Sequence, residues 1–216
     1  MTSSPSEKLN EFFAQFPPLR YKKRETILRA GEVPQGLHFL ESGYVRLHAL
    51  SEDGEELTLV IYKPGDFFPV VWTFYGGGPS IYYFETLTPV LMRRASREPF
   101  LEFIQANPDV FMLVTQRVIS RFQISLRRME YLTFGNASAR LASVLLVHAK
   151  EIGVERDGGI EFQIPLTHKD LANLVGMTRE TMSIELKRFE RAGLIGHIDH
   201  RLVIKDKEGL EKEAIL

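Results

Sequence analysis

The chain contains 216 residues, of which 44% are hydrophobic and 25% are charged, and it has no cysteine. The absence of cysteine excludes disulfides, thiolate-ligated iron–sulfur clusters, thiolate haem ligation and thiol redox sensing. Lysine and arginine number 27 against 28 aspartate and glutamate, so strong non-specific attraction to polyanions is not expected. No apolar run has the length of a membrane span, and the first residues lack the pattern of a secretion signal. We therefore expect a cytoplasmic protein without a membrane partner, long enough for two modest domains.

Residues 27–92 have the composition of short β-strands separated by glycine turns. Residues 36–50 are expected to hold two strands around Gly43. Residues 47–62 predict a hairpin, because Asp53-Gly54 is a strong turn signal between two alternating segments. Pro64-Gly65 indicates a further turn. Many short strands at this spacing are typical of a jelly-roll sandwich or barrel.

From Pro108 onward the strand pattern is replaced by the pattern of one long helix. Apolar residues recur at alternating intervals of three and four between Met112 and Thr133, which is the spacing of a coiled-coil seam. We expect the dimer interface to contain Ile119, Phe122, Leu126 and Met129. The alternative is a helix that packs wholly on its own domain. Gly135-Asn136 is expected to end the helix and to act as a hinge.

Residues 166–195 contain two short amphipathic patterns separated by a glycine. The apolar face of the first consists of Leu171, Leu174 and Val175, and that of the second of Met182, Leu186 and Phe189. Gly176 can adopt the positive φ that a tight turn requires, and Ala172 allows the second helix to cross closely. Thr167 and Thr178 are expected N-caps. The pattern predicts a helix-turn-helix, with an ordinary pair of turn-linked helices as the alternative.

The second of these helices begins with side chains that suit base edges in the DNA major groove. An arginine matches the O6/N7 edge of guanine, and a glutamate accepts from N4 of cytosine. The residues expected to contact DNA are Arg179, Glu180, Ser183 and Thr178, with His168, Lys169 and Arg201 directed at phosphates. One turn further along, Ile184 either meets a thymine methyl group or turns into the core.

The order of these parts resembles the Crp/Fnr family of bacterial transcription regulators. The likeness covers nearly the whole chain and rests on the turns at Gly31, Gly43, Gly54 and Gly65, on TRETMS at 178–183, and on AGLI and RLVI near a wing hairpin. It implies an α+β fold: a jelly roll of the cyclic-nucleotide-binding type at 1–107, a dimerisation helix at 108–135 and a winged helix-turn-helix at 136–216. The implied function is a homodimer that reads a pseudo-palindromic site in double-stranded DNA, without catalysis and with RNA polymerase as a candidate partner.

The resemblance does not extend to the residues with which cyclic-AMP-binding members hold the nucleotide. Pro69-Val70 stands where those members have the Gly-Glu pair that binds the ribose. Ser80-Ile81 stands where they have the Arg-Ser pair that neutralises the phosphate, and a buried phosphate without a cation is costly. We therefore predict an effector other than cyclic AMP, or none.

Aromatic residues crowd the same region, next to three consecutive glycines at 76–78. Such a cluster can line a site for an apolar or aromatic effector. The candidate pocket comprises Phe67, Phe68, Trp72, Tyr82, Tyr83 and, from the long helix, Ser125. The alternative is a β-roll whose interior is filled by its own side chains.

Two functions of other classes compete with this interpretation. A metal-dependent cupin enzyme needs clustered ligands on neighbouring strands, yet only His38 and His48 lie in the β region. We predict no metal and no cofactor, although haem bound through histidine is left open. The second is a regulatory module that acts through protein contacts with a degenerate helix-turn-helix. This second alternative remains because residues 159–205 hold seven Lys/Arg against six Asp/Glu, and such a low net positive charge gives little attraction to DNA phosphates.

Overall fold

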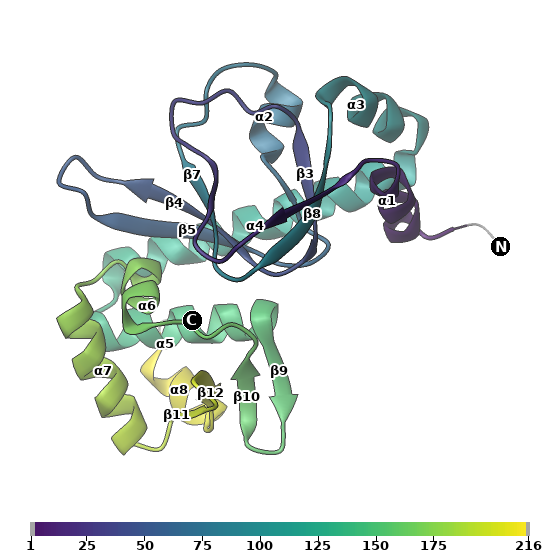
Figure 1. Ribbon diagram of the computed structural model, residues 1–216. Coiled ribbons are helices and arrows are strands. Elements are labelled where there is room, and N and C mark those ends of the chain that lie inside the picture. The colour runs from purple at the N-terminus through teal and green to yellow at the C-terminus, as the bar shows by residue number, and fades with distance from the viewer. Residues whose placement is uncertain (1–2, 215–216) are drawn as a thin grey trace. The chain divides into compact units, whose positions relative to one another are not determined.

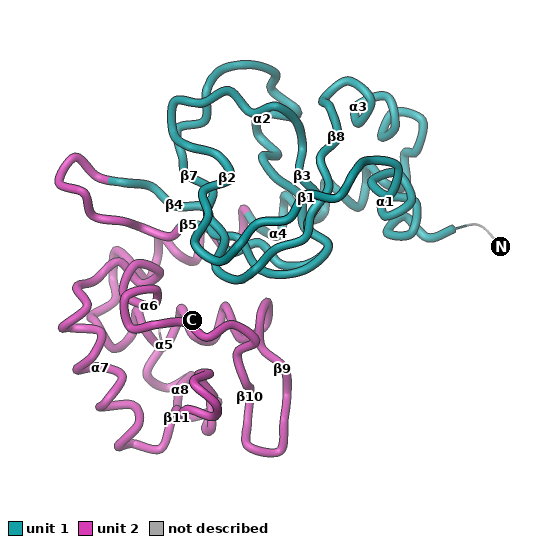
Figure 2. The backbone as a smooth tube through the Cα atoms, in the orientation of Figure 1, with its two compact units in different colours: residues 1–50, 59–121 teal, residues 51–58, 122–216 magenta. Residues whose placement is uncertain are grey.

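A computed structural model of the protein describes residues 3–214, which divide into two compact units (Figures 1 and 2). The first unit consists of residues 1–50 and 59–121, and the second of residues 51–58 and 122–216. The boundary therefore falls inside a helix, and the tip of one β-hairpin belongs to the second unit. Within the described residues, no helix has both the length and the apolarity that a membrane span requires.

The N-terminal strands form two four-stranded antiparallel sheets, which confirms the predicted jelly roll. Their orders are β1-β8-β3-β6 and β2-β7-β4-β5. The strands are β1 Pro18–Tyr21, β2 Thr26–Leu28, β3 Leu37–Ser42, β4 Val45–Leu50, β5 Glu56–Tyr62, β6 Phe67–Phe68, β7 Tyr83–Thr86 and β8 Val90–Ala95. A buried cluster joins them: Leu40 and Met92 of the first sheet pack with Leu47 and Phe84 of the second. The two strands expected around Gly43 are present, but they belong to different sheets.

Four helices accompany these sheets: α1 Pro5–Ala14, α2 Val70–Tyr75, α3 Arg97–Ala106 and α4 Pro108–Phe134. A second apolar core lies on the other side of the first sheet, where Phe13 of α1 stacks on Phe39 of β3 and Phe100 of α3 is buried. Helix α2 corrects the expectation of continuous β structure up to residue 92. The hydroxyl of Thr73 donates to the carbonyl of Pro69, one turn earlier in this short helix. The helix ends at Gly76, which has a φ of 71°.

The first half of α4 is fixed to the jelly roll by two arginines one turn apart. Arg121 pairs with Asp66 at 2.6 Å, and its guanidinium lies 4.7 Å from the ring centre of Tyr62. Arg117 donates to the carbonyl of Gly65 at 2.6 Å. Charge-assisted contacts of this kind are stronger than neutral hydrogen bonds, so they hold the turn at 63–66 against the helix.

The second unit is built around α5 (Ala137–Ile152), whose side chains are buried over most of its length. The remaining elements are β9 Gly153–Arg156, β10 Gly159–Phe162, α6 His168–Val175, α7 Arg179–Arg191, β11 Ile195–Ile198, β12 Arg201–Ile204 and α8 Lys207–Glu213. The strands form one sheet in the order β11-β12-β10-β9, in which β11 and β12 are the predicted wing. The expected break at Gly135-Asn136 is confirmed, because Asn136 caps α5 by accepting from the amide of Ala139 at 2.9 Å.

Candidate nucleic-acid interface

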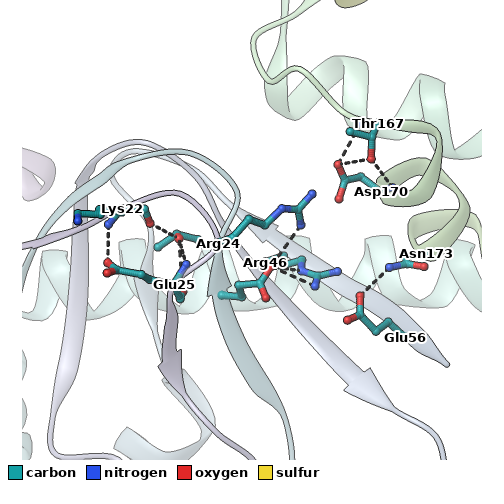
Figure 3. Close-up of polar contacts among 10 residues, drawn as sticks. Lys22, Arg24, Glu25, Arg46, Glu56, Thr167, Asp170 and Asn173 are labelled. Carbon is teal, nitrogen blue, oxygen red and sulfur yellow. Dashed lines mark hydrogen bonds and ion pairs between the residues drawn. The ribbon is translucent and has the colours of Figure 1, made fainter. Parts of the chain in front are cut away.

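The helix-turn-helix is formed by α6, the turn at Gly176 and α7, as the sequence predicted. Thr167 and Asp170 make a complete capping box at the start of α6: each side chain accepts from the backbone amide of the other (Figure 3). Gly176 takes the left-handed conformation, with φ of 72° and ψ of 51°. Thr178 then caps α7 by accepting from the amide of Thr181 at 3.2 Å. These local bonds satisfy amides that a helix start otherwise leaves unpaired.

Burial divides α7 into a core face and a solvent face. Met182, Leu186 and Phe189 are fully buried. Arg179 and Glu180 are exposed in the first turn of the helix, where recognition helices present side chains to bases. Ile184 is 66% exposed, which settles the alternative left by the sequence: its side chain does not enter the core.

A hollow of about 580 Å³ lies beside the start of α7 and is lined by Thr167, His168, Lys169 and Arg179. It lies at the N-terminal ends of α6 and α7, whose backbone dipoles favour negative charge. The two basic side chains add full positive charge. This arrangement suits a phosphate group, and it brings together three of the residues expected from the sequence to contact DNA.

Ser183 is brought into this site, but its hydroxyl already has partners inside the protein. The hydroxyl donates to the carbonyl of Arg179 and lies 2.9 Å from Nδ1 of His168. Because His168 starts α6 and Ser183 belongs to α7, the contact ties the two helices together. Glu185 is engaged as well: it bonds Ser138 of α5 and pairs with Arg188 at 3.4 Å.

Arg201, expected to contact phosphate, begins strand β12 of the wing and pairs with Glu161 of β10 at 2.9 Å. Next to it, Asp199 and His200 both adopt positive φ at the tip of the hairpin. The wing is therefore a tight hairpin whose basic residue shares its charge with a carboxylate of the neighbouring strand.

Two contacts at the far end of α6 were not predicted from the sequence. The side-chain amide of Asn173 donates to Glu56, at the start of β5, with a distance of 2.7 Å (Figure 3). Arg128 of α4 donates to the carbonyl of Leu174 at 2.9 Å. Leu57 and Leu132 border Gly176, where an added Cβ would lie 3.4 and 3.7 Å from their methyl carbons. The turn of the helix-turn-helix is thus held by side chains from outside α6 and α7.

The six residues of the candidate effector pocket are not brought to one place. Phe68 lies inside the jelly roll, 5.1 Å from Phe84 between ring centres and 5.0 Å from Tyr62. Phe67, adjacent in the same strand, faces the opposite core with α1 and α3. Tyr83 stacks on His48 of β4 at 5.3 Å. Tyr82 packs at the edge of the inner cluster, Trp72 is half-buried in α2, and Ser125 is exposed on α4.

Aromatic stacking fills the interior of the jelly roll. Burial raises the pKa of Tyr62 to about 12, so this side chain is neutral there. Arg46 is buried on β4, but it pairs with Glu85 of β7 at 3.1 Å, and Arg24 bonds the same carboxylate at 3.2 Å (Figure 3). Within residues 3–214 no group of three histidine, aspartate or glutamate side chains could hold a metal ion.

The residues expected at a dimer interface form an exposed stripe along α4. Ile119, Phe122, Leu126 and Met129 are all more than two-fifths exposed in the single chain. Val114, in the first half of the helix, is buried against the jelly roll. The helix therefore has one covered apolar face and one uncovered apolar face.

Comparison with known proteins identifies the family. Residues 139–213 match the Crp-like helix-turn-helix domain, and residues 18–107 match the cyclic nucleotide-binding domain. The chain is 30% identical over 205 residues to the cAMP-activated global transcriptional regulator CRP of Pasteurella multocida, covering 94% of this chain and 97% of that protein. The chain belongs to the Crp/Fnr family. Its relatives are transcription regulators rather than enzymes, as the sequence predicted.

Solved structures of the Crp/Fnr family agree with this assignment. A CRP/FNR-family transcriptional regulator from Thermus thermophilus is 27% identical, with a TM-score of 0.71 and coverage of 91% of this chain and 97% of that one. FixK2 from Bradyrhizobium japonicum has a TM-score of 0.80 at 20% identity, covers 93% of this chain and 98% of its own, and supports the fold. Crp/Fnr regulators bind DNA through the helix-turn-helix domain and act as dimers.

Proposed function

We propose that this Crp/Fnr regulator works in the cytoplasm as a homodimer that inserts one α7 helix into each half of a pseudo-palindromic DNA site. A two-fold dimer places its half-sites about one helical turn of DNA apart. The observation that supports the proposal most directly is that the side chains of Arg179 and Glu180 are available to bind DNA. Both are exposed at the start of a capped helix, and no bond to another part of the described chain occupies either side chain.

Phosphate contacts are assigned to the residues around the hollow at the start of the two helices. Lys169 and His168 supply the side chains there, and Thr178 is exposed at the adjoining cap. Ser183 is proposed to position His168 rather than to read a base, because its hydroxyl is already bonded on both sides. Arg201 is proposed to contact a phosphate while its guanidinium stays paired with Glu161, so part of its charge is already neutralised. Phosphate contacts fix the register, and base contacts give the specificity.

Binding to a selected and to a scrambled DNA duplex tests this division of roles. The duplex is selected by the full chain from a randomised library, and fluorescence anisotropy measures affinity at fixed salt. Arg179→Ala should weaken binding to the selected duplex by about 1–3 kcal/mol and should change binding to the scrambled duplex little. Lys169→Ala should weaken both equally. Equal losses on both duplexes for Arg179→Ala would refute a base-reading role.

The dimer is proposed to form through the exposed stripe on α4. Ile119, Phe122, Leu126 and Met129 are spaced as the a and d positions of a coiled coil, and a soluble chain gains by covering them. Changes in how the two DNA-binding domains hang from these helices would then carry an effector signal, with Gly135-Asn136 as the hinge. RNA polymerase is the partner such a regulator would meet at a promoter.

The effector is proposed to be something other than cyclic AMP, or absent. The Pasteurella relative is a cAMP-activated protein by name. In this chain Val70 begins a helix, the hydroxyl of Ser80 donates to the carbonyl of Tyr82, and the stacked rings of Phe68 and Phe84 fill the interior. The Gly-Glu and Arg-Ser pairs that would hold a ribose and a cyclic phosphate are missing from this sequence.

One observation favours a second candidate function, a regulatory module that acts through protein contacts. Residues 159–205 hold seven Lys/Arg against six Asp/Glu, and two of these cations are paired: Arg188 with Glu213 at 2.8 Å and Arg201 with Glu161 at 2.9 Å. Low positive charge weakens the phosphate contribution on which DNA binding depends. A gel shift with DNA from the region upstream of the chain's own gene distinguishes the two candidate functions. A sequence-specific DNA-binding protein should give a shifted band that persists in the presence of competitor DNA of random sequence, whereas a module that acts through protein contacts should not.

A further inference from the structure

Helix α7 carries one apolar side chain on its solvent face, and that side chain has no role in the protein's own core. The exposed residues of α7 are Arg179, Glu180, Ile184, Lys187, Arg188, Glu190 and Arg191, of which only Ile184 is apolar. At about 100° per residue, Ile184 lies about 200° around the helix from Met182, a fully buried core residue. It therefore points away from the domain.

The neighbours of Ile184 place it on the surface that meets bases. Glu180 lies four residues earlier on the same side of the helix and is exposed. The other side chains of the first turns are committed elsewhere: Ser183 bonds the carbonyl of Arg179, and Glu185 bonds Ser138 of α5. The side chains left to face a base pair are one cation, one carboxylate and one branched hydrocarbon.

Among the four bases, only thymine offers an apolar group in the major groove, its C5 methyl. We propose that Ile184 is a specificity-determining residue that packs on the C5 methyl group of a thymine in each half-site. The proposal rests on the DNA-binding function proposed above and adds to it one base that the protein selects without a hydrogen bond.

Helix geometry limits where that thymine lies. Four residues of α-helix rise about 6 Å, and successive base pairs are about 3.4 Å apart. The thymine should therefore lie within about two base pairs of the base contacted by Glu180. Replacement of thymine by uracil removes only the methyl group and leaves every hydrogen-bonding atom in place, so it isolates the contact.

The experiment uses the duplex that the full-length protein selects from a randomised library. Each thymine of one half-site is replaced singly by uracil, and affinity is measured by anisotropy. At one position the wild-type protein should lose about fourfold in affinity, the effect of one buried methyl group. Ile184→Ala should bind the thymine duplex more weakly and should bind the thymine and uracil duplexes equally at that position. Ile184→Val, which keeps a branched side chain, should retain most of the difference.

Ile81→Ala is the matched control, because Ile81 is an exposed isoleucine (74%) in the loop before β7 of the first unit. It should keep the full thymine–uracil difference. A wild-type protein that discriminates at no thymine within about two base pairs of the Glu180 contact would overturn the proposal. So would Ile184→Ala protein that still discriminates at the same position. If the full chain enriches no sequence at all, the proposed DNA-binding function fails and this inference fails with it.

Discussion

The side-chain amide of Asn173 donates a hydrogen bond to the carboxylate of Glu56 at 2.7 Å, joining positions 117 residues apart in the sequence (Figure 3). Asn173 lies in the last turn of α6 and is only 4% exposed. Glu56 lies at the tip of the β4–β5 hairpin, which belongs to the second unit (Figure 2). The first helix of the helix-turn-helix is therefore held by a segment that precedes it by more than half of the chain.

Removal of the acceptor at Glu56 should loosen the end of α6. Glu56→Leu leaves a buried amide of Asn173 unpaired, and an unsatisfied buried polar group costs about 1–3 kcal/mol. Glu56→Gln keeps an oxygen that can accept, so it should cost less. Hydrogen exchange of the backbone amides of residues 171–176 measures the effect, and exposed Glu55→Leu serves as control. Unchanged exchange in Glu56→Leu would show that water replaces the carboxylate without loss.

Arg128 should stabilise the same end of α6 from the side of α4. It is 8% exposed, and it donates to the carbonyl of Leu174, near the negative end of the α6 dipole. A hydrogen bond from a charged donor contributes about 1.5–3 kcal/mol, so Arg128→Met should lower the melting temperature of the C-terminal unit and speed exchange in α6. Arg127→Met, at an exposed neighbour, should do neither. Similar behaviour of the two variants would contradict this role.

Local chemistry made much of the fold predictable. Thr167, Gly176 and Thr178 determine the ends of α6 and α7 through bonds to residues within three or four positions. Asp53-Gly54 places the β4–β5 turn in the same way, with Gly54 at φ of 79°. Helix α2 was missed because the aromatic run at 72–75 favours strand by propensity, whereas its helix depends on Thr73 closing back on Pro69.

The residues of the candidate site were likewise predictable only where their position depends on neighbours in the sequence. Arg179 and Glu180 follow directly from their position after the turn glycine, and the structure leaves both exposed. Glu56 and Arg128 carried no signal, since an exposed hairpin glutamate and a helical arginine have ordinary solvated alternatives. Phe67 and Phe68 looked like one cluster in the sequence, but adjacent residues of a strand face opposite sides, so the two rings lie in different cores.

The exposed stripe on α4 predicts a variant that cannot dimerise. Phe122 is 62% exposed in the single chain, and in a coiled-coil seam Phe122→Asp would bury a charge without a partner. Sedimentation should then show monomers, and the monomers should no longer bind a palindromic duplex. Gln123→Asp introduces the same charge one residue away, on an exposed position, and should remain dimeric. A dimeric Phe122→Asp protein would place the interface on another face of the helix.

The jelly roll should lose stability in mild acid because of His38. Burial first, and then the positive charge of Arg94, lower the pKa of His38 from 6.5 to about 4. Between these pH values the unfolded chain binds the proton and the folded chain does not, so stability is full above pH 6.5 and declines toward pH 4. The slope from this group is at most about 1.4 kcal/mol per pH unit.

Trp72, the one tryptophan of the chain, lies in the same unit and reports its unfolding in urea. Measurements between pH 7.5 and 5 keep most carboxylates ionised, so the histidine contribution is isolated. His38→Gln cannot take up the proton, and its stability should change less over this range than that of the wild-type protein. Equal slopes for the two proteins would show that His38 reaches solvent in the folded state.

Cyclic AMP and cyclic GMP should not bind at micromolar concentrations in calorimetry, and neither should alter DNA affinity. The sequence has no arginine between Lys63 and Arg93. A cyclic phosphate in the jelly roll would therefore be buried without a cation to neutralise it. Losing one charge-assisted pair in a buried site costs several kcal/mol, and each 1.4 kcal/mol is a factor of ten in affinity. Arg46 is a buried arginine of the jelly roll, but it is paired with Glu85 at 3.1 Å. Micromolar binding of a cyclic nucleotide would contradict this prediction. If Arg46→Met then abolished the binding, Arg46 would have left Glu85 to bind the phosphate. If Arg127→Met abolished it, the cation would come from α4.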